Sequence, residues 1–160
     1  MEEEFIARTV QSIVTDVLAQ RTCMTLKLAT ALIDKVEEKA ANLGIAVVVA
    51  ISDASARPVA IHCMDGSYMA SFDVALNKTY TSAGLKISTS ELGKLSQPGE
   101  SLYGVQFTNE GKIVIFGGGE PLMIGDTMIG ALGISGGTAE QDTELAIYGK
   151  SILKEVIACL

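Results

Sequence analysis

The sequence lacks the features that mark several common classes of protein. Its longest strongly apolar run, at residues 45–51, is far shorter than the roughly 20 residues that a membrane-spanning helix needs. Its first residues, MEEEFIARTV, have neither the basic start nor the apolar run of a secretory signal. Acidic residues number 19 and basic residues 12, which gives a formal net charge of −7. Because nucleic acids and anionic lipids attract basic surfaces, we expect neither as a partner. The lack of a spanning run and of a secretory signal leads us to expect a cytoplasmic location.

Cysteine and histidine are also scarce. The three cysteines, Cys23, Cys63 and Cys159, form no zinc-binding spacing, so we expect three reduced thiols, two of them partly buried. A G-x-S-x-G match spans residues 133–137, but a nucleophile elbow needs a histidine later in the chain. The single histidine, His62, lies upstream. A serine triad is therefore disfavoured, and Ser135 is expected to end a strand.

Apolar periodicity and turn residues predict the order of the secondary-structure elements. Helices are expected at residues 1–19, 25–43, 69–85, 89–95 and 138–160, the last opened by a capping box of Thr138 and Gln141. Strands are expected at residues 45–51, 59–64, 112–116, 122–124 and 127–135, with a hairpin turn at Gly125-Asp126. Because the strands fall in hairpin-connected groups, the sequence predicts an α+β domain with an antiparallel sheet of about five strands. Residues 1–22 are expected to form a helical extension and residues 23–160 a single domain.

A glycine-rich stretch, FGGGEPLMIGDTMIGALGISGGTAEQD at residues 116–142, holds eight of the sixteen glycines. It is no P-loop, because Glu120 and Pro121 follow its glycines where Gly-Lys-Ser/Thr is needed. It is no dinucleotide fingerprint either, because Leu122 stands where the third glycine would fall. The run Gly117-Gly118-Gly119-Glu120-Pro121 is expected to be a sharp turn. Gly136 and Gly137 precede a helix N-terminus, which indicates either ordinary capping or a nest for a ligand carboxylate or phosphate.

Five side chains are further candidates for chemistry. His62 and Met64 would share one face of a strand, and both residue types can ligate haem iron, although a single strand cannot place both on one iron. His62 can equally be a surface residue. Lys78, within ALNKTYTSAG, is either a solvated lysine or a partner for a carboxylate. Asp53 is either a turn residue or, with Lys78 and Asp142, an acid–base group.

These stretches resemble a known family. The segment AVVVAISDASARPVAIHCMDGSYMAS, the helix ALNKTYTSA and the ending GKIVIFGGGEPLMIGDTMIGALGISGGTAEQD are similar to the motifs of the GlcG/HbpS-like haem-binding family, which includes the C-terminal domain of PduO-type proteins. The resemblance covers roughly residues 25–160. It implies a profilin-like three-layer arrangement of sheet and helices and assembly into homo-oligomers. The chain departs from the family in having His62-Cys63 where an arginine precedes Met-Asp-Gly, a change that would either create or remove a haem ligand.

Three hypotheses about function follow. The first is a small-ligand or haem-binding accessory protein of a glycolate, diol, glycerol or corrinoid-linked gene cluster. In it His62 would be the iron ligand, and the surrounding groups would be Met64, Lys78, Gly117, Gly118, Gly119, Pro121, Gly136 and Gly137. The second is an enzyme acting by proton transfer on a small carbonyl or hydroxy acid, for which Lys78, Asp53 and Asp142 are weak candidates and no catalytic residue is assigned. The third is a structural oligomer subunit without chemistry.

Overall fold

The computed structural model describes residues 6, 9, 10 and 23–160. The helix predicted at residues 1–19 lies outside this description, apart from Ile6, Thr9 and Val10, which are helical. Ile6 and Val10 are both exposed. Among the described residues, no helix is both long enough and apolar enough to cross a membrane.

A four-stranded antiparallel sheet forms the middle of the domain, in the order β2-β1-β4-β3. Its strands are β1 (Val48–Asp53), β2 (Pro58–Cys63), β3 (Gly119–Ile124) and β4 (Thr127–Ser135). Hairpins join β1 to β2 and β3 to β4, and β1 pairs with β4 in the centre of the sheet. Both predicted hairpins are confirmed, including the turn at Gly125, whose φ of 57° suits glycine.

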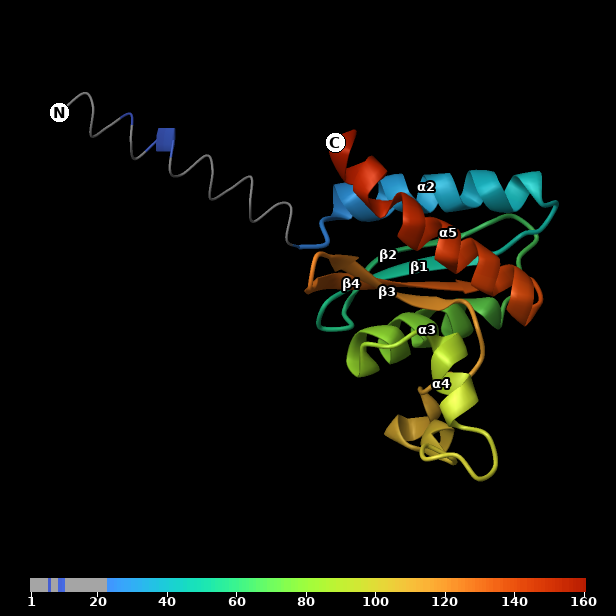
Figure 1. The fold of residues 1–160 in the computed structure, drawn as a ribbon. Helices are drawn as coiled ribbons and strands as arrows, with labels where there is room; N and C mark the ends of the chain where they lie inside the picture. The colour runs from blue at the N-terminus through green and yellow to red at the C-terminus, as the bar shows by residue number, and fades with distance from the viewer. Residues whose placement is uncertain (1–5, 7–8, 11–22) are drawn as a thin grey trace.

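Helices cover both faces of this sheet (Figure 1), which gives the expected three layers. On one face lie α2 (Leu26–Asn42) and α5 (Ala139–Ala158), and on the other lies α3 (Ser71–Leu85), followed by the short α4 (Thr89–Leu95). The larger core lies beneath α2 and α5, where Val49 and Ile51 of β1 and the preceding Val47 are buried. The α3 face has a much smaller apolar cluster, made of Val48, Ala50 and Ala75.

The sheet has one strand fewer than expected, because residues 112–116 do not form a strand. This segment docks on α3 instead. The backbone N–H of Val114 donates to Thr81 Oγ1 at 2.9 Å, and the Thr81 hydroxyl lies 3.3 Å from the carbonyl oxygen of Lys112. Ile113 and Val114 are buried by this contact. The β-branched residues Ile113 and Val114 are therefore buried although the segment has no partner strand.

The turn predicted at residues 117–121 ends earlier than expected, because β3 begins within it. Gly119, Glu120 and Pro121 belong to β3 rather than to a turn, and Pro121 pairs with Ala131 of β4. A proline is tolerated here because β3 is an edge strand, whose outer N–H groups have no ladder partner.

The three cysteines are all exposed, so the expectation of two partly buried thiols was wrong.

The N-terminus of α5 is fixed by the predicted capping box. Thr138 Oγ1 accepts from the N–H of Gln141 at 3.2 Å, and Gln141 Oε1 accepts from the N–H of Thr138 at 2.9 Å. We expect Thr138→Ala to lower the free energy of unfolding by about 1 kcal/mol, because a helix N–H loses its acceptor. Chemical denaturation measures this, with Thr30→Ala, at a partly buried position within α2, as the control. A loss equal to that of the control would contradict the capping role.

Candidate functional site

A buried ion pair joins the two faces of the domain. Lys78 of α3 is fully buried, and its Nζ lies 2.8 Å from Asp142 Oδ2 in the first turn of α5. Nζ also donates to the carbonyl oxygen of Ile134 near the end of β4. The solvated interpretation of Lys78 is therefore wrong. The structure brings Lys78 and Asp142 together, as the acid–base hypothesis requires.

Burial changes the ionisation of both partners. It lowers the pKa of Lys78 below the usual lysine value, although the negative charge of Asp142 and its hydrogen bond oppose this shift. It raises the pKa of Asp142, against the opposing effects of Lys78 and of hydrogen bonds from Gly137 and Gly136. Both shifts favour the neutral forms. The two groups are therefore closer in proton affinity than a lysine and an aspartate in water.

The predicted glycines pack closely around this pair. A Cβ at Gly118, where φ is 110°, would lie 2.6 Å from Lys78 Nζ and 2.8 Å from Asp142 Cβ. The N–H of Gly137 donates to Asp142 Oδ1 at 2.9 Å. The nest at Gly136 and Gly137 thus receives a carboxylate from the chain itself, which supports the ordinary capping interpretation. Gly118 and Gly137 therefore let the chain approach the ion pair closely.

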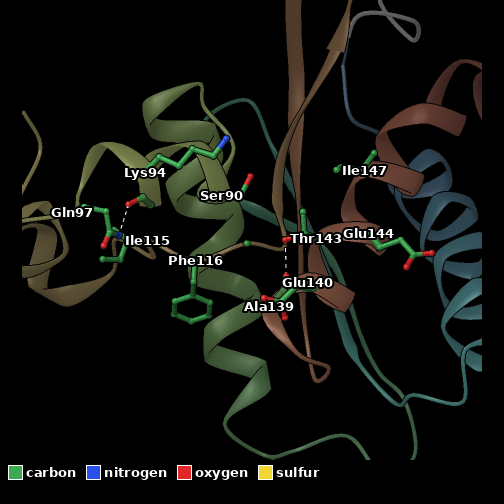
Figure 2. Close-up of a pocket in the computed structure, with 12 residues that line it drawn as sticks. Ser90, Lys94, Gln97, Ile115, Phe116, Ala139, Glu140, Thr143, Glu144 and Ile147 are labelled. Carbon is green, nitrogen blue, oxygen red and sulfur yellow. Dashed lines mark hydrogen bonds between the residues drawn. The ribbon is translucent and has the colours of Figure 1, made fainter. Parts of the chain in front are cut away.

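A cavity of about 700 Å³ opens beside this pair, between α4 and the first half of α5. Figure 2 shows the segment 115–117 between the two helices, with Lys94 on one side and Glu140 and Glu144 on the other. The Phe116 ring lines the cavity, is about half exposed, and has its centroid 5.0 Å from Lys78 Nζ. Lys78 itself does not line the cavity. Phe116 therefore lies beside the ammonium group and also faces the cavity.

His62 and Met64 lie away from this cavity. His62 is on β2, at one edge of the sheet, whereas the glycine-rich strand β3 forms the other edge. The predicted alternation is seen: Ile61 packs toward the α3 side, whereas Met64 packs against the core beneath α2 and α5. His62 Nδ1 lies 3.4 Å from Glu37 Oε2 of α2, and the His62 side chain keeps 35% of its surface exposed. The structure therefore separates these residues from Lys78 and from Gly119 at the other edge of the sheet. Gly136 is nearer, because it packs against Val47, whose carbonyl oxygen accepts from the N–H of Met64.

Asp53 is also remote from the ion pair. Its Oδ1 accepts hydrogen bonds from the N–H groups of Ser55 at 2.8 Å and Arg57 at 3.0 Å, as in a turn residue. It pairs with Gly130 at one end of β4, whereas Lys78 binds the carbonyl of Ile134 near the other end. Strand geometry places the two ends more than about 10 Å apart. The acid–base set is thus reduced to Lys78 and Asp142.

Sequence reasoning did not identify Phe116, Lys94 or Glu37 as site residues. Phe116 had been assigned to a strand, and Lys94 to a short helix with no further role. Glu37 contacts a histidine 25 positions away in the sequence, so no local spacing shows that contact. A helix-period pattern places Glu37 only on the polar side of α2.

Comparisons with known proteins agree on one family. The model of the HbpS-like haem degrading proteins matches residues 24–150. A 15.0 kDa uncharacterised protein encoded between dhaT and dhaS of Citrobacter freundii is 42% identical over 127 residues, covering 79% of this chain and 89% of that protein. The crystal structure of Klebsiella pneumoniae ORFY is 39% identical with a TM-score of 0.79, covering 86% of this chain and 92% of that one. A crystal structure described as a PduOC–haem complex is 35% identical with a TM-score of 0.77, covering 81% of this chain and 94% of that one.

Proposed function

We propose a haem-binding accessory role for this chain, which belongs to the HbpS-like family. One observation carries the proposal: a relative of the same fold, 35% identical over 81% of this chain, is described as a haem complex. The position of another relative's gene between dhaT and dhaS supports a role beside metabolic enzymes. We further propose that the chain acts as a homo-oligomer within a glycolate, diol, glycerol or corrinoid-linked gene cluster.

The donor chemistry around His62 fits haem iron. An iron-binding histidine is usually held by a carboxylate or carbonyl on its second ring nitrogen, which fixes the tautomer. Glu37 stands in that position toward Nδ1, so Nε2 is the nitrogen that remains for iron. His62 is the single histidine of the sequence, so an imidazole-ligated haem in this protein depends on it. Met64, on the same side of the sheet, is partly buried against the core and would shape the site.

The cavity beside Phe116 is the alternative place for a porphyrin, because much of its lining is apolar. The apolar lining includes Ile115, Phe116 and Ile147, and Lys94 would pair with a propionate of a haem bound there. In the described structure its lining contains no histidine, methionine, cysteine or tyrosine, so it supplies none of the common iron ligands. We therefore propose His62 rather than this cavity as the place of iron ligation.

Bound haem would supply redox and dioxygen chemistry, and the residues of this chain would hold it. Glu37 would orient the imidazole and increase its basicity. Lys78 cannot pair with a propionate while it remains fully buried against Asp142. We propose instead that the Lys78–Asp142 pair and the glycines around it hold α3, α5 and β4 in place.

Absorbance titration of the purified full chain with haem tests the proposal. We expect a saturable Soret change with a fixed stoichiometry per chain, because a specific site binds a fixed number of haem molecules. A change that rises in proportion to added haem without saturation would contradict a specific site. The same titration of an unrelated acidic protein of similar size gives the non-specific baseline.

The close approach of Lys78 and Asp142 supports a second candidate function, acid–base chemistry on a small carbonyl compound. Such chemistry needs a lysine that a small molecule can reach. Reductive trapping with a small aldehyde, followed by peptide mass mapping, measures this. Modification of Lys78 at a rate similar to the exposed Lys94 would favour an enzyme. Protection of Lys78 in the folded protein would exclude it.

A further inference from the structure

We infer that Asp34, Glu37 and His62 form a binding site for a divalent transition-metal cation of the zinc class. One possible ligand atom from each residue lies within 4.8 Å of the other two. Asp34 and Glu37 are one helical turn apart on α2, whereas His62 comes from the edge strand β2. The site is thus assembled by packing the helix on the sheet and is more than a local run of acidic residues.

The spacing of two of these atoms already suits a bound ion. Ligands about 2.1 Å from a tetrahedral ion stand about 3.4 Å from one another. His62 Nδ1 and Glu37 Oε2 are 3.4 Å apart. Asp34 is exposed, so its side chain is free to rotate toward the same point. Little backbone movement is therefore needed to bring the third ligand to the ion.

The charge balance leaves the two carboxylates available. The neighbouring lysines on α2 are engaged elsewhere: Lys35 pairs with Glu38 at 3.3 Å, and Lys39 pairs with Glu144 at 3.4 Å. Among the described residues, the structure records no cationic partner for Asp34, and His62 is the one recorded for Glu37. One neutral imidazole and two carboxylates would therefore carry a net charge of −2, which a divalent cation neutralises.

The ligand types select the class of cation. Imidazole favours zinc, copper, nickel and iron over magnesium and calcium, which prefer sites made wholly of oxygen. Three protein ligands leave a position for water or another molecule, as in open zinc sites. On binding, the cation would lie between His62 Nδ1 and Glu37 Oε2, and the proton of the neutral imidazole would then sit on Nε2.

The proposed cation site goes beyond the proposed haem function, and the two would use different nitrogens of His62. Iron ligation by haem would use Nε2 with the proton on Nδ1, whereas the cation would use Nδ1. The two ligands therefore compete for His62, and both involve Glu37. Asp34 serves the cation alone.

Calorimetric titration of the full chain with Zn²⁺, and visible absorbance with Co²⁺, test the site. We expect one saturable ion per chain, with binding weakened at least about tenfold in Asp34→Asn and in His62→Ala, because loss of even an outer-shell partner costs about 10–100-fold. Glu38→Gln, on the same helix, is the matched control and should leave binding unchanged. Circular dichroism checks that each variant is folded, which their exposed or half-buried positions favour.

Two results would overturn the inference: no saturable Zn²⁺ binding by the wild type, or equal weakening by Glu38→Gln and Asp34→Asn. Haem titration of Asp34→Asn separates the two proposals. Unchanged haem binding with lost Zn²⁺ binding supports an independent cation site. Loss of both in His62→Ala shows that the two ligands share the imidazole.

Discussion

Replacement of Lys78 by alanine is expected to destabilise the protein by about 3–5 kcal/mol. The reason is that the variant leaves the carboxylate of Asp142 buried without its cation, which is the costly way to disrupt a buried ion pair. It also removes a donor from the carbonyl oxygen of Ile134. Urea denaturation followed by circular dichroism gives the free energy of unfolding.

The paired replacement Lys78→Met with Asp142→Leu is the informative control. Removing both charges together relieves the desolvation cost, so we expect stability within about 2 kcal/mol of the wild type, the remaining loss coming from the Gly137 N–H without its acceptor. A double variant as unstable as Lys78→Ala would show that the lost hydrogen bonds to Ile134 and Gly137, rather than an unpaired charge, dominate. A Lys78→Ala protein as stable as the wild type would contradict the buried pair itself.

The second large effect is expected at Gly118. Alanine here would adopt a φ of 110° that L-residues rarely use, and its Cβ would collide with Lys78 Nζ and with the Ile134 carbonyl oxygen. The backbone strain and the overpacking together should cost about 2–5 kcal/mol. The same denaturation experiment measures the loss.

Gly125→Ala provides the matched comparison, because Gly125 also has a positive φ, of 57°, but open space around its Cβ position. We expect it to cost only the backbone strain, about 1–2 kcal/mol. The difference between the two glycines therefore reports the close approach of the chain to the ion pair. Equal losses at both positions would mean that Gly118 does not need to be small for packing.

The sequence predicted the elements whose side chains follow a single period. The helix α2 buries Leu28, Leu32 and Val36 at helical spacing, and the strand β4 has the predicted bounds of residues 127–135. The ordered motifs also predicted the family, which the comparisons confirm. In these segments, apolar burial and local turn chemistry favour the same structure, so the local sequence pattern is sufficient to predict it.

The sequence failed where polar groups are buried. The helix α3 buries four polar residues, Lys78, Thr79, Thr81 and Ser82, so apolar spacing did not identify its buried side. Two features permit this arrangement. Gly133 of β4 lets the α3 backbone come close, since a Cβ there would lie 2.1 Å from the Ala75 carbonyl oxygen, and Asp142 arrives from a helix 64 positions away. Contacts between residues so far apart in the sequence form only in the assembled fold, so a local sequence pattern does not show them.

Haem titration of the wild type and of His62→Ala, followed by Soret absorbance, tests the central claim most directly. We predict a saturable site in the wild type and, in the variant, at least about tenfold weaker binding with a shifted Soret band, because the single imidazole of the chain is lost. Imidazole added to the variant should restore the wild-type spectrum. Equal affinity and an unchanged Soret band in His62→Ala would contradict iron ligation by His62.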